Sequence, residues 1–523
     1  MRNEEKTLSK TENNVYFRDL SYEVTYLSSL QNGVEAKINA EEWLLKFSLE
    51  ENTLLLSSNS TSIDLSNSSV EEITKLNNKD IIFLNQPKTE KFVIKNSFVT
   101  NQSINIRTSF QKITTACLLE FVKSDYVFTE PHKFRTLIQY NSKINAINFL
   151  YYFAHFIEDE SQRLCISTRN DKITNCLNGI AFFHRGVTFL VYNYKQNIND
   201  DKTYFVLEAV NSVDYDNYIV ASNEIINVIG FFTTTYPFGP YMIFDYEYSF
   251  CIAYKNCLGK PRTAKYSMIT LNPYEYYLDR DIKDIIFGKD DNHTKNLSVE
   301  TKLKPVEKKQ FEKMLSLLDN KNFSNMFFSL QQISTITSNE SCQSHMVSLI
   351  IYAACLEEIA KWFNNYIPNK SSEKSILLSR KTRKKLIEEF SMILDSCKDE
   401  NQEDIKKIKN KIKGGLFCKP NADNLSEPFK YFNVELSVED EKLLSLRNKI
   451  LHGTDILESK LDCNNVLSYV TEINRYCFGF YSLIWRLIMK IIDYEGVYRD
   501  VATLNEKFWK NQSNNGEPFI KKI

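Results

Sequence analysis

The chain has 523 residues, more than one compact core accommodates, so two or three domains are expected. Its 65 Lys and Arg residues balance 66 Asp and Glu residues, which excludes a strong overall attraction to nucleic acid and leaves only local charge asymmetry. The 11 cysteines are scattered without a CxxC pair, which argues against a disulfide framework and a zinc ribbon. Cys165, Cys176 and His184 come nearest to a metal-ligand set, but their spacing does not fit one. Neither a metal nor another cofactor is expected.

The beginning of the chain favours a cytoplasmic protein. "MRNEEKTLSK" is charged and lacks the apolar core of a secretory signal. Two apolar runs, 149–157 and 476–492, are not expected to cross a membrane. The first is too short, and Arg486 and Lys490 interrupt the second.

Residues 15–285 contain mostly short runs of β-branched and aromatic residues bounded by Asn, Asp, Ser and Gly, which predict strands. The clearest runs are WLLKFSLEENTLLLSS, KFVIKNSFV, GVTFLVYNY, TYFVLEAV and YMIFDYEYSFCIAY. "EENT" predicts a hairpin loop, and "YPFGPY" predicts a turn. We expect a β-rich, antiparallel region over residues 1–290, with one or two subdomains and with most of its aromatic residues in the core.

Residues 291–304 are polar and without periodicity, which predicts a linker. From residue 305 to 523 the apolar residues recur at helical spacing, so this part is expected to be an all-α bundle. The fold class predicted for the whole chain is therefore α+β and multidomain.

The most suggestive stretch is "LRNKILHGTD", residues 446–455, which begins inside a helix predicted over about 438–452. Ser437 and Asp440 have the spacing of a capping box, and Gly453 follows the last periodic residue. The apolar face of this helix comprises Leu443, Leu444, Leu446, Ile450 and Leu451. Arg447 falls in the middle of that face, where an unpaired charge would cost several kcal/mol. Arg447 therefore requires either a carboxylate partner or a side-chain conformation that brings its guanidinium to solvent.

An earlier helix around "IIYAACLEEIAKWF" offers that carboxylate. Its predicted apolar stripe comprises Met346, Leu349, Ile350, Ala353, Leu356, Ala360 and Phe363. Glu357 lies at the edge of the stripe among apolar neighbours, which favours an ion pair with Arg447. Glu358, about 100° further round the helix, is the second candidate.

Asn448 and His452 are four residues apart and share one edge of the predicted helix. A histidine at the last turn lies near backbone carbonyls that favour its protonated form, so His452 suits general acid or base chemistry. The same residues also fit an ordinary basic last turn closed by a glycine. The pattern alone leaves both interpretations open.

Two segments of the chain resemble parts of a known domain family. "LRNKILHG" resembles the R-x4-6-H signature of HEPN domains, with Arg447, Asn448 and His452 at the matching positions. "ACLEEIAKWF" is similar to the HEPN helix that carries an acidic residue after a leucine, matching Leu356 and Glu357. A β-rich region followed by a HEPN bundle is similar to the arrangement of ApeA-type anti-phage proteins.

The resemblance implies a metal-independent endoribonuclease that leaves a 2′,3′-cyclic phosphate and a 5′-hydroxyl. It implies a homodimer in which two motifs face each other, RNA as substrate, and abortive infection as the biological setting. Arg447 would bind phosphate and His452 would act in acid–base catalysis. Asn448 would orient the substrate, and Glu357 or Glu358 would position the arginine. The N-terminal region would be a sensor or restraint with a phage-derived trigger.

Local charge supports RNA binding in part. Residues 370–413 contain thirteen Lys and Arg against eight Asp and Glu, a net of about +5 (13 − 8). Lys381, Lys384 and Lys385 share a helix face, and Lys449 lies beside the R-x4-6-H motif, so these four lysines are candidate RNA contacts. An ordinary solvated face explains the same pattern.

Two other functions remain open. The bundle fits a non-catalytic HEPN-like dimerisation or partner-binding module, and the β-rich region fits a receptor for a phage protein, a glycan or a peptide. The other histidines have no paired acid near them in sequence and are expected to be structural: His132, His155, His184, His293 and His345.

Overall fold

The chain divides into two compact units. The computed structural model describes residues 15–17, 20–38, 41–48, 53–58, 78–84, 90–105, 112–124, 126, 130–140, 164–167, 177–194, 203–233, 240–248, 250–256, 308–336, 342–366, 380–396, 401–415, 421–451, 466–495, 497–499 and 520–523. One unit comprises residues 1–316 with 496–499, and the other comprises residues 317–495 with 500–523. The predicted β-rich N-terminal half and helical C-terminal half are confirmed at this level. The predicted linker, 291–304, lies outside the described residues.

The first unit is built on one 14-stranded sheet. The strands are β1 (Val15–Phe17), β2 (Val34–Ile38), β3 (Glu41–Ser48), β4 (Thr53–Ser58), β5 (Asp80–Phe83), β6 (Glu90–Asn105), β7 (Lys112–Lys123), β8 (Phe134–Tyr140), β9 (Leu164–Ser167), β10 (Leu177–His184), β11 (Val187–Tyr194), β12 (Thr203–Ala209), β13 (Pro240–Asp245) and β14 (Phe250–Asn256). Their order is β1-β9-β10-β11-β12-β8-β13-β14-β7-β4-β3-β2-β5-β6. Among the strands that the structure describes, β1 pairs with β9 in parallel and the other pairings are antiparallel.

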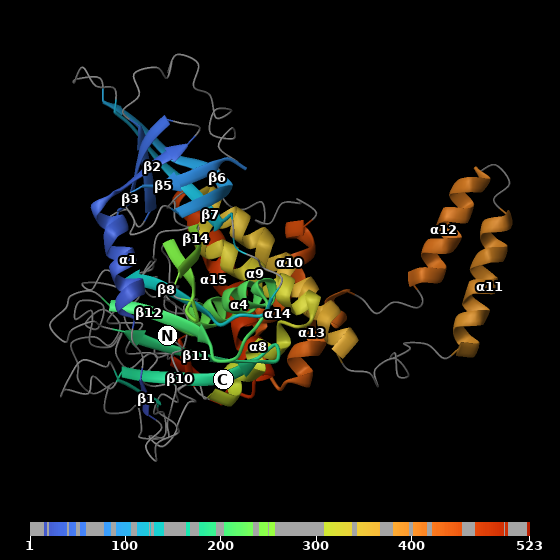
Figure 1. Cartoon of the computed structure of the whole chain (residues 1–523). Helices are drawn as coiled ribbons and strands as arrows, with labels where there is room; N and C mark the ends of the chain where they lie inside the picture. Colours follow the sequence, from blue (N-terminus) through green and yellow to red (C-terminus); the bar gives the residue numbers. More distant parts are fainter. Residues whose placement is uncertain are drawn as a thin grey trace. The chain divides into compact units, whose positions relative to one another are not determined.

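Six strands of this sheet form a closed ring. Strand β7 pairs with β14, with β4 and also with β6, so β7, β4, β3, β2, β5 and β6 form a closed ring (Figure 1). The hairpin predicted from WLLKFSLEENTLLLSS is present as β3 and β4, with Ser48 opposite Thr53. The loop residues 49–52 lie outside the described residues. Closure leaves no unpaired edge within the ring itself.

Two helices of this unit are missing from the sequence prediction. They are α1 (Ser21–Asn32) and α4 (Tyr215–Thr233). Helix α4 follows an Asx-type start, in which the backbone N–H of Asn217 donates to Asp214 Oδ1 at 2.9 Å. The aromatic and β-branched residues of α4 resemble a strand in composition, but burial on most sides of a helix selects the same residues.

Strand β12, which lies outside the ring, is buried on both of its faces. Tyr204 and Val206 of β12 belong to the core on the α1 side, while the intervening Phe205 and Leu207 are buried as well. The hydroxyl of Tyr218 on α4 donates to the Leu207 carbonyl at 3.0 Å. A strand covered on two faces has a continuous apolar run, which explains why TYFVLEAV does not alternate.

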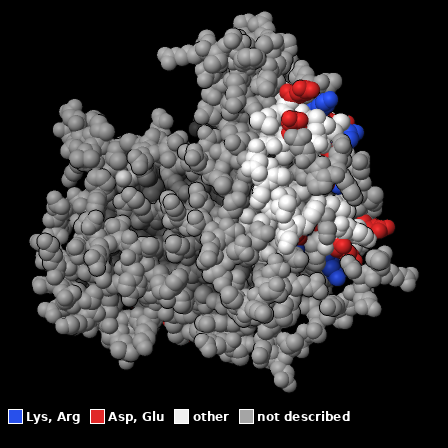
Figure 2. Space-filling view, turned by 60° about the vertical axis from the view of Figure 1, so that its left-hand side comes forward, with Lys and Arg blue, Asp and Glu red and all other residues white. Residues whose placement is uncertain are grey.

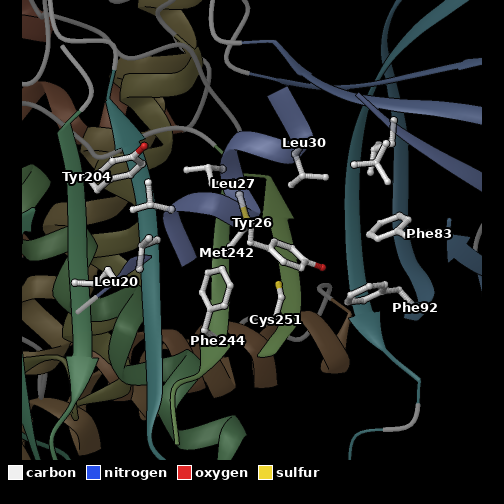
Figure 3. Packing of buried hydrophobic residues seen from close by; sticks show 14 of the residues in the cluster. Leu20, Tyr26, Leu27, Leu30, Phe83, Phe92, Tyr204, Met242, Phe244 and Cys251 are labelled. Carbon is white, nitrogen blue, oxygen red and sulfur yellow. The ribbon is translucent and has the colours of Figure 1, made fainter. Parts of the chain in front are cut away.

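The core on the α1 side of the sheet contains residues of α1, of the closed ring and of the strands outside the ring. Figure 3 shows Tyr26 of α1 between Phe244 of β13 and the rings of Phe83 and Phe92. Tyr26 and Phe244 meet edge to face with 5.8 Å between ring centroids. The Tyr26 hydroxyl donates to Glu90, so the polar end of this buried ring has an acceptor.

A charged network lies inside the same unit. Arg135 of β8 donates from Nε to Glu208 at 2.9 Å and from Nη1 to Glu23 of α1 at 2.5 Å, and all three side chains are buried. Tyr192 donates to Glu208 at 2.9 Å, and the Tyr246 ring lies 4.4 Å from the guanidinium carbon. Burial alone would lower the pKa of Arg135, but Tyr192 and the two carboxylates hold it above its ordinary value.

A second buried carboxylate ties the β10–β11 hairpin to α4. His184 Nε2 lies 2.7 Å from Glu224, and Arg185 donates to both Glu224 oxygens at 2.6 and 2.7 Å. Arg185 and Gly186 form the turn with φ of 49° and 79°. Burial would raise the pKa of Glu224, but the hydrogen bonds from His184 and Arg185 outweigh it and lower the pKa.

We therefore expect Glu224 to make the first unit acid-sensitive. A carboxyl whose pKa is lowered on folding contributes stability above its unfolded pKa of about 4.3, and that contribution is lost as the pH falls through the folded pKa. Glu224→Gln should flatten the loss of thermal stability below about pH 4.3 relative to the parent chain. Glu35→Gln, at an exposed position of β2, is the control. Equal acid profiles for the parent and Glu224→Gln would contradict this prediction.

Helix α8 (Lys308–Leu317) belongs to the first unit up to Ser316. Its Phe311 contacts Phe182 and Phe232, with ring centroids at 5.1 and 6.1 Å. The β-rich unit therefore carries a helix from the segment that the sequence places in the helical domain.

The second unit is mainly helical. Its described helices are α9 (Lys321–Ile336), α10 (Cys342–Tyr366), α11 (Arg380–Ser396), α12 (Gln402–Gly415), α13 (Asn421–Tyr431), α14 (Val438–Leu451) and α15 (Val466–Ile491). Residues 305–523 are not all helical, because they include the short strands β15 (Val497–Arg499), which falls in the first unit, and β16 (Ile520–Lys522). Among the helices described, none combines the length and apolarity that a membrane crossing requires.

Candidate functional site

Helix α14, which carries the R-x4-6-H motif, is fixed at its N-terminus by the predicted capping box. The Asp440 N–H donates to Ser437 Oγ at 3.1 Å, and the Ser437 N–H donates to Asp440 Oδ2 at 2.8 Å. Arg486 of α15 adds an ion pair to the same Asp440 oxygen at 2.7 Å and donates to the Glu435 carbonyl at 3.2 Å. The start of α14 is thus tied to α15 by charge as well as by capping.

Arg447 lies where the helical periodicity places it, inside the bundle. Its exposed fraction is 5%, and Leu443, Leu444 and Ile450 of the same face are also buried. The guanidinium Nη2 contacts Glu357 Oε1 of α10, which is the pairing predicted from the sequence. The Glu357 side chain is 39% exposed, so one side of this ion pair is accessible to solvent.

The environment of Arg447 combines two opposing effects. Burial lowers the pKa of its guanidinium, and the adjacent Glu357 carboxylate favours the charged form. The arginine retains its charge because its ordinary pKa lies far above neutral pH, and the adjacent carboxylate reduces the cost of burying that charge. The pair can hold the end of α14 against α10, and its exposed edge can meet an anionic group.

The apolar stripe of α10 is turned relative to the prediction. Leu349, Ala353, Leu356, Ala360 and Phe363 are buried as expected. Ile350 is 46% exposed, so its assignment to the stripe was wrong. The buried residues of α10 include Tyr352 and Ile359 instead, and α9, α13, α14 and α15 all contact this helix.

Glu358 does not replace Glu357 as the partner of Arg447. Its carboxylate pairs with Lys361 of the same helix at 2.6 Å. The choice between the two carboxylates is therefore settled geometrically in favour of Glu357, as the sequence analysis preferred.

The other motif residues are only partly described. Asn448 lies in α14, but its side chain is outside the described set, and His452 and Gly453 follow Leu451 beyond the described residues. Lys449 is exposed on α14. The structure thus brings Arg447 and Glu357 together and leaves the placement of His452 as a prediction.

A close helix crossing lies one turn before Arg447. A Cβ built at Gly479 of α15 would lie 2.5 Å from Leu443 Cδ1 of α14, closer than side-chain atoms approach. An alanine at this position would force the Leu443 side chain to shift. Sequence reasoning gave no indication of this contact, because Gly479 stands inside an otherwise apolar helical run.

Two of the four candidate RNA-binding lysines have carboxylate neighbours. Lys384 lies 3.9 Å from Glu388 and Lys385 lies 3.8 Å from Glu389, both within α11 and highly exposed. The Lys381 side chain is outside the described set. On the face shown in Figure 2, basic and acidic side chains of the described residues are interspersed. The carboxylates beside Lys384 and Lys385 weaken the interpretation of α11 as a phosphate-binding face.

A histidine–aspartate pair in the first unit was missed by sequence reasoning. His132 Nδ1 lies 3.4 Å from the buried Asp245, to which Tyr126 also donates at 2.8 Å. The rings of Tyr126 and Tyr248 lie 5.6 and 5.5 Å from the His132 ring. Only the β8–β13 pairing brings these residues together, and no local motif indicates it.

Metal ligation finds no support in the part of the chain that is described. No group of three or more His, Cys, Asp or Glu side chains there is placed to hold an ion. His184 engages Glu224, and Cys176 lies outside the described residues.

Comparison with protein-family models, with curated proteins and with solved structures finds no match for this chain.

Proposed function

We propose that the chain is a HEPN-type, metal-independent endoribonuclease of an anti-phage abortive-infection system, acting as a homodimer. The observation that carries the proposal is the buried Arg447 paired with Glu357 on a neighbouring helix. His452 follows this helix directly in sequence. A charged arginine near a helix end with a histidine is a suitable set for phosphodiester chemistry without a metal.

In the proposed reaction, the ribose 2′-oxygen attacks the adjacent phosphorus and the 5′-oxygen leaves. His452 accepts the 2′-hydroxyl proton, or donates a proton to the leaving 5′-oxygen. Arg447 stabilises charge on the phosphate, with Asn448 orienting the substrate and Glu357 positioning the guanidinium. The products are a 2′,3′-cyclic phosphate and a 5′-hydroxyl.

In the proposed setting, the first unit restrains the nuclease until a phage-derived trigger binds. Lys381, Lys384, Lys385 and Lys449 are the proposed minor RNA contacts. The carboxylates beside Lys384 and Lys385 mean that each contact would neutralise phosphate only in part.

A second candidate is a non-catalytic HEPN-like dimerisation or partner-binding module. The deep burial of Arg447 favours it, because a buried arginine compensated by one carboxylate also suits a purely structural ion pair. In this alternative, Arg447 holds α14 against α10 and touches no substrate.

The test is RNA cleavage by the full chain in excess chelator, with and without extract of phage-infected cells. We expect fragments with 5′-hydroxyl and 2′,3′-cyclic phosphate ends, and we expect Arg447→Ala and His452→Ala each to reduce the rate by about 100-fold or more. Arg475→Ala is the matched control, because Arg475 also pairs with two carboxylates, Glu472 and Glu439, in the same bundle. Arg475→Ala should cleave at the parent rate.

Two outcomes would decide against the nuclease. Cleavage that persists in both the Arg447 and the His452 variants would remove these residues from the chemistry. A folded parent chain that cleaves no RNA under either condition would leave the non-catalytic module.

A further inference from the structure

A buried aspartate at the end of β13 holds groups from three segments of the first unit. The Asp245 side chain is 0% exposed. Its Oδ1 accepts the backbone N–H groups of Glu247 and Tyr248 at 3.1 and 3.3 Å. Its Oδ2 accepts the Tyr126 hydroxyl at 2.8 Å and lies 3.4 Å from Nδ1 of His132. The turn after β13 accounts for the contacts of Oδ1, but not for the hydroxyl and the imidazole that meet at Oδ2.

This carboxylate determines which nitrogen of His132 can accept a hydrogen bond. A carboxylate beside Nδ1 favours the tautomer with its proton there, which leaves a lone pair on Nε2. The two nitrogens point to opposite sides of the imidazole, so Nε2 faces away from Asp245, and the His132 side chain is 14% exposed. Within the part of the chain that is described, no donor contacts Nε2. Burial and the hydrogen bond to Asp245 raise the pKa of Tyr126, so its hydroxyl remains a donor to the same carboxylate.

An exposed aromatic ring stands beside this nitrogen. The Tyr248 ring is 60% exposed, lies 5.5 Å from the His132 ring and makes an angle of 69° with it. Phe250 supports the Tyr248 ring in a stacked arrangement, with 6.2 Å between centroids and 24° between planes. Since Oδ1 of Asp245 holds the Tyr248 backbone and Oδ2 faces the imidazole, one buried group fixes the ring and the nitrogen relative to each other.

An exposed aromatic face next to a hydrogen-bond acceptor suits a nucleobase. Stacking on an aromatic side chain stabilises a base of any sequence, and an exocyclic amino group supplies the donor that Nε2 accepts. A sugar has hydroxyl donors but lacks the flat π-face.

The charged neighbours of this surface are of both signs. Lys133 and Glu247 adjoin His132 and Tyr248 in sequence. Lys123 lies over the Phe250 ring at 4.5 Å and is paired with Glu90. These charges do not select an anionic ligand, so the base rather than a phosphate is the group that the site recognises.

We propose that His132 and Tyr248 form a binding site for a nucleobase, which stacks on the Tyr248 ring and donates its amino N–H to Nε2 of His132. Asp245 is the positioning residue, because it holds both groups and touches no ligand. The site lies in the first unit and requires neither Arg447 nor His452, so it is independent of the proposed nuclease chemistry.

Calorimetric titration of the full chain with two nucleosides tests the proposal. Adenosine carries the amino donor, whereas dimethyladenosine, with both amino hydrogens replaced by methyl groups, keeps the stacking ring without it. The parent should bind adenosine about 3- to 10-fold more tightly, as expected for one hydrogen bond. His132→Phe keeps an aromatic ring and removes both nitrogens, so it should bind the two nucleosides with equal affinity.

A second variant removes the stacking surface. Tyr248→Ala alters an exposed side chain and should weaken adenosine binding about tenfold. Tyr431→Ala is the matched control, because Tyr431 is 56% exposed and lies in the helical unit, and it should bind adenosine as the parent does. Arg447→Ala should also bind as the parent does. Thermal denaturation verifies that each variant is folded, and Tyr248→Ala decides the test if His132→Phe is not.

Four results would overturn the proposal. They are a parent that binds no adenosine, a parent that binds both nucleosides equally, a preference for adenosine that persists in His132→Phe, and unchanged adenosine binding in Tyr248→Ala. A loss of binding in Arg447→Ala or Tyr431→Ala would place the nucleoside in the helical unit and would overturn it as well.

Discussion

Arg135→Met is expected to destabilise the first unit by about 3–5 kcal/mol, because removing one partner of a buried ion pair leaves uncompensated charge. Glu23 and Glu208 lie on either side of the Arg135 guanidinium, and both are buried. Without the arginine, two buried carboxylates would share one site without the guanidinium that now lies between them. Hydrogen exchange of β8 and β12 in the full chain, followed by mass spectrometry, measures the loss.

Two controls separate charge from packing in this prediction. Lys91→Met removes an exposed pair with Asp80 and should cost at most about 1 kcal/mol. Changing Glu23 and Glu208 to Gln in the Arg135→Met background should recover much of the loss, because the remaining groups are neutral. Unchanged protection of β8 and β12 in Arg135→Met would show that the network contributes little.

Gly479→Ala is expected to destabilise the helical unit, although alanine is normally the better helix residue by about 0.5–1 kcal/mol. The added Cβ would lie 2.5 Å from Leu443 Cδ1, and overpacking of a buried contact costs about 1–3 kcal/mol. Displacement of α14 would also move Arg447, one turn beyond Leu443, away from Glu357. Urea unfolding followed by circular dichroism measures the change.

A double-mutant cycle identifies the contact responsible. In the Leu443→Ala background the obstructing atoms are gone, so Gly479→Ala should become neutral or stabilising. The same loss in both backgrounds would place the strain elsewhere on α15.

Features that depend on neighbours in sequence could be predicted. The capping box of Ser437 and Asp440, the β3–β4 hairpin and the burial of Arg447 all follow from spacing within one or two elements. The pairing of Arg447 with Glu357 followed from a physical requirement, since a buried guanidinium needs an acceptor and one helix offered a carboxylate at its edge.

Features that depend on strand order could not be predicted. Arg135 and Glu23 are 112 residues apart, and only the topology of the sheet and α1 brings them together. The same is true of His132 with Asp245 and of the closed ring. Ile350 was misassigned because periodicity alone does not reveal which side of α10 the neighbouring helices cover.

The parallel pairing of β1 with β9 imposes an order on synthesis of the chain. The register joins Val15 to Cys165, so the first strand cannot complete its pairing until residue 165 has left the ribosome. The ring strands between Val34 and Lys123 are all available earlier and can close among themselves. Strand β1 can therefore pair at the sheet edge only after the ring strands have been synthesised. Until then its backbone groups are open to pairing with other strands during translation.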